Sequence, residues 1–347
     1  MATLTINGKK VTAPDTMTIM EAAMMHGFRV PHLCKHPALS TFGGCRLCVV
    51  SVKGIPKPVA SCTTSVSDGM EVTTSTPEIE GYRKMVLELI LSDHPNDCMT
   101  CEATGNCALQ ELAYEYGAKG QEYAGERRTY PKRDGNPFIE RDLEKCVMCG
   151  RCVKVCDEIQ GVEAINFGYR GFKSKICTTY EDDLDCEFCG QCVSVCPTGA
   201  LTGKQWARRG RYEGVREVDT TCPYCGTGCT VTAHVKGNEI VRISSKPWTP
   251  NEGWLCVKGR FGYKFVNSPD RLTKPLIRRA SGEFEETSWT GALEYTAAWF
   301  KKIKEKHGAD AIGGLSSARC TNEENYVFQK FMRAAIGTNN VDHCARL

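Results

Sequence analysis

The order of hydrophobic and polar residues changes several times along the chain. In the first 78 residues, short alternating runs are bounded by turn residues, and an Asn7-Gly8 pair is typical of a hairpin turn. Strands are predicted at residues 3–6, 9–12, 48–52 and 71–74, and a short helix at residues 19–26. The chain therefore begins with a small β-rich module.

Later segments follow the period of helices. This period predicts helices at residues 77–92, 289–306 and 321–336, the last opened by a capping box of Thr321 and Glu324. A short apolar run at residues 311–315 predicts a buried strand. The order of strand and helix indicates an α/β domain in this last part.

Two intervening segments carry turn signals instead. Residues 113–137 are rich in Gly, Tyr, Lys and Arg and are interpreted as a linker. The pair Gly237-Asn238 predicts a second hairpin.

The 22 cysteines change this picture, because only Cys320 and Cys344 lie beyond residue 260. The first two-thirds of the chain is therefore expected to consist of small modules stabilised by metal, and the last third of a conventional core.

The sequence carries no signal for secretion. The amino terminus MATLTINGKKVTAPD is polar and lacks the basic and apolar regions of a secretory leader. No stretch approaches 18 consecutive apolar residues. We therefore expect a cytoplasmic protein without a membrane span, whose thiols are reduced and bound to metal.

The most specific motif is C-x2-C-x2-C-x3-C, which occurs twice between residues 146 and 196. This is the ligand pattern of a two-cluster ferredoxin, in which the fourth cysteine of each run binds the cluster of the other run. The predicted ligands of one 4Fe-4S cluster are Cys146, Cys149, Cys152 and Cys196, and those of the second are Cys186, Cys189, Cys192 and Cys156. Zinc knuckles or disulfides are the alternatives, but a third cysteine two residues on has no use in a zinc site.

A different spacing in the first module favours a 2Fe-2S cluster. Its cysteines form a broad loop with C-x2-C at the centre and single outlying cysteines, and Gly43 and Gly44 allow the backbone to approach the sulfurs. The predicted ligands are Cys34, Cys45, Cys48 and Cys62. A zinc site remains the alternative.

Four more ligands follow the helix predicted at residues 77–92. A histidine before a proline is usually a cap or a surface residue, but three nearby cysteines need a fourth partner. The predicted ligands of this 4Fe-4S cluster are His94, Cys98, Cys101 and Cys107. Imidazole in place of thiolate makes such a site less negative and should raise its potential.

A fifth site is predicted from C-x2-C-x3-C with a distant fourth cysteine. Its ligands are Cys222, Cys225, Cys229 and Cys256. A zinc ribbon also uses distant pairs, but the gap to the third cysteine fits it poorly. The five sites leave out Cys177, Cys320 and Cys344, and Cys177 is interpreted as a structural thiol.

The formal net charge of +3 does not indicate a nucleic-acid-binding protein. Five clusters bound as thiolates would bring the holoprotein to about −6. The sequence also has no run of lysines and arginines. No nucleic-acid partner is expected.

These motifs resemble several known families. The first two ligand sets resemble the amino terminus shared by the large iron-sulfur subunit of respiratory complex I and iron-only hydrogenases. The double ferredoxin run fits the hydrogenases and not the plain complex I subunit. The Cys222 to Cys256 site does not fit the hydrogenases and resembles the motif that opens the molybdopterin oxidoreductases.

Within that superfamily, three segments resemble formate dehydrogenase catalytic subunits. They are Cys256-Val-Lys258-Gly259, Arg271-Leu-Thr-Lys-Pro-Leu-Ile-Arg278 and Ser316-Ser-Ala-Arg-Cys-Thr-Asn-Glu-Glu-Asn325.

The resemblance implies an α+β multidomain fold with five parts. These are a β-grasp 2Fe-2S domain at 1–78, a histidine-ligated 4Fe-4S domain at 79–118, a double 4Fe-4S ferredoxin domain at 138–215, a small β-rich molybdopterin oxidoreductase 4Fe-4S domain at 216–275, and the beginning of a truncated molybdopterin-binding α/β domain at 276–347.

The function implied by the resemblance is the interconversion of formate and carbon dioxide. The complete enzyme would hold molybdenum or tungsten with a bis-molybdopterin guanine dinucleotide, and the five clusters, one 2Fe-2S and four 4Fe-4S, would link it to other proteins. Those partners would be NAD(P)-reducing flavin and iron-sulfur subunits, hydrogenase subunits, or ferredoxin. Lys258 would bridge the pterin and the Cys222 cluster as an electron relay, although a solvated lysine is the alternative.

The sequence departs from the formate dehydrogenases at its end. In that family a stretch like Asn339 to Leu347 is followed by the selenocysteine or cysteine that binds the metal. Cys344 lies four residues too early to replace it. We hypothesise that this is the amino-terminal part of a selenocysteine-dependent formate dehydrogenase, which without that ligand would lack catalysis of its own.

Two other functions fit the same motifs. The chain could be a complete electron-transfer protein without catalysis, or part of another molybdopterin oxidoreductase such as a nitrate reductase. The first alternative predicts a compact segment after residue 280, and the truncation hypothesis predicts an exposed one.

Overall fold

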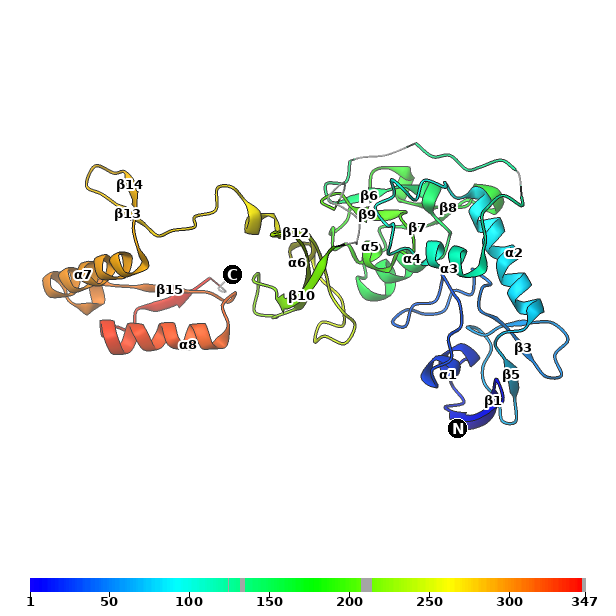
Figure 1. Cartoon of the computed structure of the whole chain (residues 1–347). Coiled ribbons are helices and arrows are strands. Elements are labelled where there is room, and N and C mark those ends of the chain that lie inside the picture. Colours follow the sequence, from blue (N-terminus) through cyan, green and yellow to red (C-terminus); the bar gives the residue numbers. More distant parts are fainter. Residues whose placement is uncertain (124, 132–134, 207–213, 345–347) are drawn as a thin grey trace. The chain divides into compact units, whose positions relative to one another are not determined.

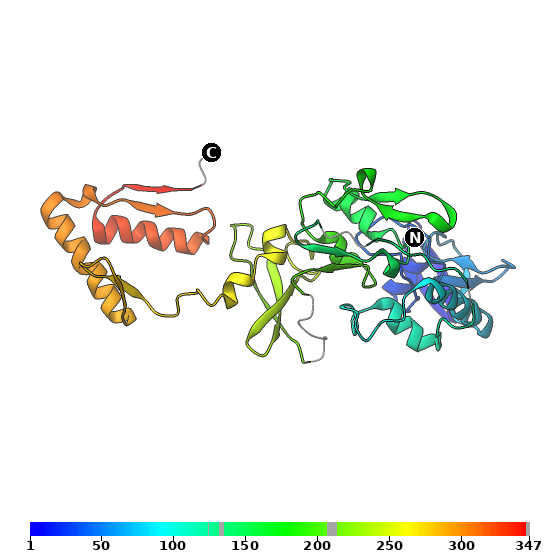
Figure 2. The same cartoon turned by 90° about the horizontal axis from the view of Figure 1, so that it is seen from above.

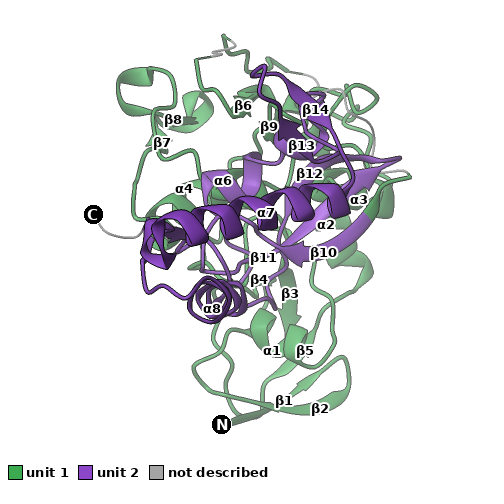
Figure 3. Cartoon of the chain, turned by 90° about the vertical axis from the view of Figure 1, so that its left-hand side faces the viewer, with its two compact units in different colours: residues 1–216 green, residues 217–347 purple. Residues whose placement is uncertain are grey.

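The computed structural model describes residues 1–123, 125–131, 135–206 and 214–344. The chain divides into two compact units, Met1–Arg216 and Glu217–Leu347 (Figure 3). Together they form a mixed α and β multidomain protein.

The first unit begins with a five-stranded sheet in the order β2-β1-β5-β3-β4 (Figure 1). Strands β1 and β5 pair in parallel, and the other neighbours are antiparallel. The hairpin between β1 and β2 turns at Asn7 and Gly8, which both have positive φ angles, as an Asn-Gly turn requires. The strands are β1 (Ala2–Ile6), β2 (Lys9–Ala13), β3 (Val49–Val52), β4 (Val59–Ala60) and β5 (Glu71–Thr73).

Helix α1 (Ile19–Met25) packs against this sheet. Thr18 and Glu21 form its capping box, so two amides at its start have partners. Its fully buried side chains, Ile19 and Met20 among them, join the strands in one apolar core. Cys48 and Cys62 belong to the same core, so the loop that carries the first four cysteines packs against it.

Helices α2 (Pro77–Asp93) and α3 (Ala108–Tyr116) follow. Arg83 of α2 is only 2% exposed, and its guanidinium donates to the carbonyls of Leu47, Val49 and Thr74 at 2.8 to 3.0 Å. Because these bonds are shielded from water, Arg83 fixes α2 to the cysteine-bearing module.

The region with the two ferredoxin runs repeats itself in backbone geometry. Met148 and Phe188 lie at equivalent positions and both have left-handed backbone, with φ of 52° and 54°. Their amides donate to Sγ of Cys146 and Cys186. Each run then reaches a glycine with positive φ and a short helix, α4 (Arg151–Lys154) or α5 (Gln191–Val195).

Two small antiparallel pairs frame this repeat. Strand β6 (Ile139–Arg141) pairs with β9 (Leu201–Gly203), and β7 (Asn166–Gly168) pairs with β8 (Lys175–Cys177). The first pair joins the beginning and the end of the region, which brings the two cysteine runs together.

The second unit begins with a three-stranded sheet and a short helix. The elements are β10 (Arg216–Thr221), β11 (Thr230–Lys236), β12 (Glu239–Ser244) and α6 (Val257–Phe261). Leu255 and Tyr263 pack on β11 and β12, so both ends of the fifth cysteine set rest on one core.

The rest of the second unit contains helices and two separate strand pairs (Figure 2). Helix α8 lies beside the parallel pair β15 and β16, and Gly314 of β15 approaches the ring of Phe328 closely. The elements are β13 (Leu276–Arg278), β14 (Phe284–Glu286), α7 (Trp289–His307), β15 (Gly314–Ser316), α8 (Asn322–Lys330) and β16 (Val341–His343).

The structure corrects three secondary-structure predictions. Residues 309–311 form a 3-10 turn, so the strand predicted at 311–315 begins only at Gly314. The helix predicted at 321–336 is regular up to Lys330 and continues as a π-helical turn. The linker predicted at 113–137 begins inside α3, and its residues 124 and 132–134 lie outside the described residues.

No helix among the described residues is long and apolar enough to cross a membrane.

The bonding of Arg83 leads to a stability prediction. Replacing Arg83 with Met leaves three buried carbonyls without donors, so the opening free energy of β3 should fall by about 3 kcal/mol. Amide hydrogen exchange of the holoprotein measures this quantity. The control is Arg29→Met, which removes an exposed ion pair with Glu115 and should change it by less than about 1 kcal/mol. Equal effects of the two variants would contradict the assigned role.

Candidate functional site

The four cysteines predicted to hold the 2Fe-2S cluster lie together beside the first sheet. Cys34, Cys48 and Cys62 are 3% exposed or less, and the sulfurs of Cys48 and Cys62 are 3.3 Å apart. Hydrogen bonding by the Cys45 thiol holds the pKa of Cys34 far below its usual range. Hydrogen bonding by Cys62 similarly lowers the pKa of Cys48 to about 6.

This donor set fits a group that binds thiolates. Backbone amides of Gly44 and Cys45 also stabilise the Cys34 thiolate, and the Leu33 amide donates to Cys45 Sγ at 3.4 Å. A side chain at Gly44 would collide with the Phe42 ring, so only glycine leaves room for that ring. The Gly44 amide is at the same time a hydrogen-bond donor to the Cys34 sulfur.

His94 ends helix α2, and its ring has the arrangement of a ligand. Its Nδ1 lies 2.9 Å from the Pro95 carbonyl, which leaves Nε2 as the unprotonated nitrogen. Nε2 is buried and has no hydrogen-bond partner among the described residues. Burial lowers the pKa of His94, so the neutral form is favoured. A buried lone pair held in one direction is what metal coordination requires.

The three cysteines that follow His94 act on one another electrostatically. Burial raises the pKa of Cys107 to about 11, and the charges of Cys101 and Cys98 add to this effect. The Lys145 ammonium and the Asp97 carboxylate influence the pKa of both Cys101 and His94. The histidine and the cysteine therefore lie near the same two charges.

The two ferredoxin runs exchange their fourth cysteines. Burial and then the charge of Cys196 raise the pKa of Cys149 to about 12. One apolar cavity is lined by the sulfur-bearing residues Cys146, Cys149, Cys152 and Cys196. Cys196 thus lies with the first run, as the motif predicts.

Cys156 correspondingly lies with the second run. Burial raises the pKa of Cys192, and the charges of Cys189, Cys186 and Cys156 raise it further. The charge of Cys192 also raises the pKa of Cys152, which shows that the two ligand sets are neighbours.

In the part of the chain that the structure describes, no three His, Cys, Asp or Glu side chains gather closely enough to hold one metal ion. A zinc site requires four ligands around one ion, whereas a cluster spreads its ligands over several irons. When bound, the clusters would supply one-electron transfer.

The Cys146 set also borders the 2Fe-2S set and the histidine set. A pocket of about 480 Å³ is lined by Cys45, His94 and Cys146 together with neighbouring residues. On the other side, a side chain at Gly199 would meet Cys101 Sγ at 2.6 Å. The ligand sets are therefore arranged around a central one.

In the second unit, the four cysteines of the fifth site also act on one another. Burial raises the pKa of Cys229, and Cys222, Cys225 and Cys256 contribute. The Cys222 amide donates to the Cys229 carbonyl at 2.8 Å, which closes the loop. The described geometry thus brings together the residues predicted for this site.

Lys258 lies in α6 beside this loop. Hydrogen bonding by Thr227 lowers the pKa of Cys225, and the cations Arg319 and Lys258 lower it further. Gly226 approaches the Ala318 carbonyl so closely that an added side chain atom would lie 2.9 Å from it. Sequence reasoning identified Lys258 and missed Arg319, which only the fold brings to the loop.

A further pocket of about 310 Å³ opens where the parallel strands β15 and β16 end. Ligands bind at the carboxyl ends of parallel strands in open α/β sheets. Asn325 Nδ2 donates to the Ser317 carbonyl at 3.2 Å, which shapes one wall. Its polar lining includes Ser316, Ser317, Asn325, Arg333, Asp342 and His343.

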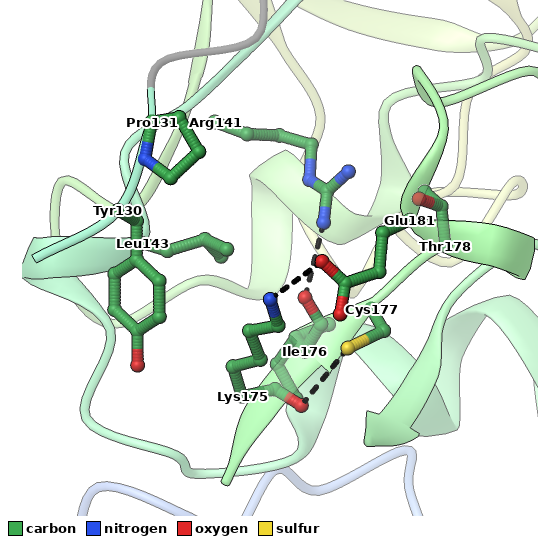
Figure 4. Close-up of a pocket in the computed structure, with 9 residues that line it drawn as sticks. All are labelled: Tyr130, Pro131, Arg141, Leu143, Lys175, Ile176, Cys177, Thr178 and Glu181. Carbon is green, nitrogen blue, oxygen red and sulfur yellow. Dashed lines mark hydrogen bonds and ion pairs between the residues drawn. The ribbon is translucent and has the colours of Figure 1, made fainter. Parts of the chain in front are cut away.

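Cys177, left out of the five sites, lines a separate small pocket (Figure 4). Its Sγ is 3.9 Å from the Lys175 carbonyl. A side chain at Gly168 would meet this sulfur at 2.5 Å. The contacts agree with a structural thiol.

The lone pair of His94 leads to a prediction on potential. His94→Cys replaces a neutral ligand with a negative one, so the iron content should stay unchanged while one 4Fe-4S midpoint potential falls. Redox titration followed by electron paramagnetic resonance (EPR) measures this potential. The matched control is His26→Cys, whose ring bonds the Thr12 carbonyl at an exposed position. An unchanged set of potentials in His94→Cys would show that His94 is not a ligand.

Family models match the chain in five consecutive segments. They are a 2Fe-2S iron-sulfur cluster binding domain (1–77), an NADH-ubiquinone oxidoreductase-G iron-sulfur binding region (83–122), an NADH-quinone oxidoreductase subunit 3 ferredoxin-like domain (136–202), a molybdopterin oxidoreductase Fe4S4 domain (215–268) and a molybdopterin oxidoreductase domain (271–347).

Curated relatives are similar over the whole chain. The alpha subunit of an NADPH-Fe(3+) oxidoreductase from Geobacter sulfurreducens is 42% identical over all of this chain and 40% of the relative. The G subunit of NADH-quinone oxidoreductase from Streptomyces coelicolor is 36% identical over 100% of this chain and 41% of its own length. The chain therefore spans about 40% of the length of these relatives.

A solved structure shows a similar fold over part of the chain. It is an NAD+-reducing [NiFe]-hydrogenase in the H2-reduced state, with 29% identity and a TM-score of 0.57 over 61% of this chain and 91% of the hydrogenase chain. With the five family matches, these similarities show that the chain combines iron-sulfur modules like those in the G subunit of NADH-quinone oxidoreductase with molybdopterin oxidoreductase domains.

Proposed function

We propose that this chain is an electron-transferring part of a multi-subunit oxidoreductase and connects a molybdopterin site with partner subunits. The observation that carries the proposal is the arrangement of the other three ligand sets of the first unit around the Cys146 set. Buried, closely spaced thiols are suited to hold redox clusters.

The proposed cofactors are one 2Fe-2S cluster and four 4Fe-4S clusters. Their ligands are the twenty residues that the motifs predict, and the buried Nε2 of His94 supports the one non-cysteine ligand. Molybdenum or tungsten with bis-molybdopterin guanine dinucleotide would complete the redox centres, and the pocket at the ends of β15 and β16 is suited to part of such a group.

In the first unit the Cys146 set has several neighbouring ligand sets. The Cys146 set borders the 2Fe-2S set through the pocket that Cys45 and Cys146 line, and it borders the histidine set through Gly199 and Cys101. The 2Fe-2S set, the histidine set and the Cys186 set thus all border the Cys146 set, so this chain is suited to exchange electrons with more than one partner.

The partners we propose are electron-transfer subunits. Relatives and the similar structure are named for NADPH, NADH and NAD+, so a subunit that reacts with a nicotinamide cofactor is the favoured partner class. Hydrogenase subunits or ferredoxin are the other partner classes that we propose.

For the substrate of the molybdopterin site, formate remains a second and finer proposal. It is supported by the Cys256-Val-Lys258-Gly259 segment and by the Lys258 cation beside Cys225. The relatives named above are NADPH-Fe(3+) and NADH-quinone oxidoreductase subunits, so the formate assignment rests on the sequence segments and the position of Lys258.

Metal analysis tests the electron-transfer proposal directly. The chain, prepared and reconstituted without oxygen, should hold about 18 iron atoms, the sum for one 2Fe-2S and four 4Fe-4S clusters. Reduction with dithionite should give EPR signals of both cluster types. Binding of zinc in place of iron, with no signals after reduction, would refute the proposal.

Lys258 offers a test of the molybdopterin end. In the protein that carries the complete molybdopterin domain, Lys258→Ala should slow formate oxidation at least tenfold and leave the iron content intact. The control is Lys264→Ala, which removes a lysine from the exposed turn that follows α6. Unchanged turnover in Lys258→Ala would reject the bridging role, and turnover with NADPH and Fe(III) but none with formate would reject formate as the substrate.

A further inference from the structure

Two partly buried cations lie between the ligand sets of the first unit, and neither is part of a predicted site. Arg151 begins helix α4 between the second and third cysteines of its run, and Lys145 directly precedes the first cysteine. Both therefore belong to the central Cys146 set by position, and each extends toward a different neighbouring set.

Arg151 reaches toward the 2Fe-2S set. Its guanidinium donates to the Lys35 carbonyl at 2.6 Å, next to Cys34 in the chain. The charges of Cys149, Cys34, Cys45 and Cys196 all act on it, so it stands between two ligand sets. Its Nε is buried without a hydrogen-bond partner among the described residues. A buried N–H donor of this kind is satisfied when an anionic sulfur lies beside it.

Lys145 reaches toward the histidine set. Its side chain is 12% exposed, and its ammonium lies 3.2 Å from Asp97 and 3.1 Å from Asp142. A side chain at Gly199 would touch both Cys101 Sγ and Lys145 Cδ, which places the lysine stem beside that sulfur. The two carboxylates pair with the charged ammonium, so the side chain carries a positive charge beside Cys101.

We propose that Arg151 and Lys145 are electrostatic tuning residues, each of which holds a fixed positive charge between the Cys146 set and one neighbouring set and raises the reduction potentials on both sides. The inference rests on the proposed electron-transfer function. The physical reason is that a reduced cluster carries one more negative charge than the oxidised cluster. A nearby cation in a weakly polar environment stabilises the reduced form more.

Arg151 and Lys145 affect the reduction potentials of different neighbours of the Cys146 set. Arg151 acts on the 2Fe-2S side and Lys145 on the histidine side, while both act on the Cys146 set between them. Asp97 and Asp142 reduce the local field of Lys145, but removal of the ammonium still makes that region more negative by one charge.

The experiment compares neutral and charge-conserving variants of the reconstituted chain. Arg151→Gln should lower the 2Fe-2S potential, and Lys145→Gln should lower the potential of the histidine set. We expect about a tenfold change in the ratio of reduced to oxidised cluster, which is about 59 mV for one electron. Arg151→Lys and Lys145→Arg should stay near the unmodified chain. EPR-monitored redox titration distinguishes the 2Fe-2S signal from the others.

The control is Lys53→Gln, which removes an exposed cation paired with Glu71 and should shift no potential. Full iron content with unshifted potentials in the neutral variants would overturn the inference and leave the electron-transfer function intact. Loss of iron from a neutral variant would assign that cation a structural role instead. Absence of iron-sulfur signals from the unmodified chain would refute the proposed function itself.

Discussion

The first unit depends on gathering cysteine sulfurs in places that are largely shielded from water. Burial raises the pKa of thiols such as Cys149 and Cys107, and their neighbours add to the effect, so without metal these groups favour the protonated form. Iron binds the thiolate form, so cluster binding removes the protons that burial favours. Cluster assembly is therefore coupled to folding. The small sheets and short helices of the first unit serve mainly to hold these sulfurs in position.

The backbone contributes as much as the side chains. Amides of Met148 and Phe188 point at sulfurs because both residues adopt left-handed backbone, and the glycines that follow allow a helix to begin at once. The two ferredoxin runs are therefore alike in conformation as well as in spacing. The β6 and β9 pair then closes the region, so the last cysteine of each run lies with the first three of the other.

Spacing in the sequence was sufficient to group the cysteines, because a cluster motif is a local property. The exchange of Cys156 and Cys196 was predicted for the same reason. The order of the ligand sets was not predictable, since it depends on contacts such as Gly199 with Cys101, between residues almost a hundred positions apart. Likewise, nothing local marks Arg319 or Arg151, whose neighbours come from distant segments. The strand predicted at 311–315 began too early because an apolar run does not show where a tight turn ends.

The parallel pairing of β1 with β5 has a consequence for biogenesis. Thr5 pairs with Glu71, so the first sheet cannot close until both strands have left the ribosome. All four cysteines of this module lie between the two strands and are synthesised before the second one. Until β5 is available, the sheet beside these thiols is incomplete, so the newly made thiols are less shielded than in the finished fold.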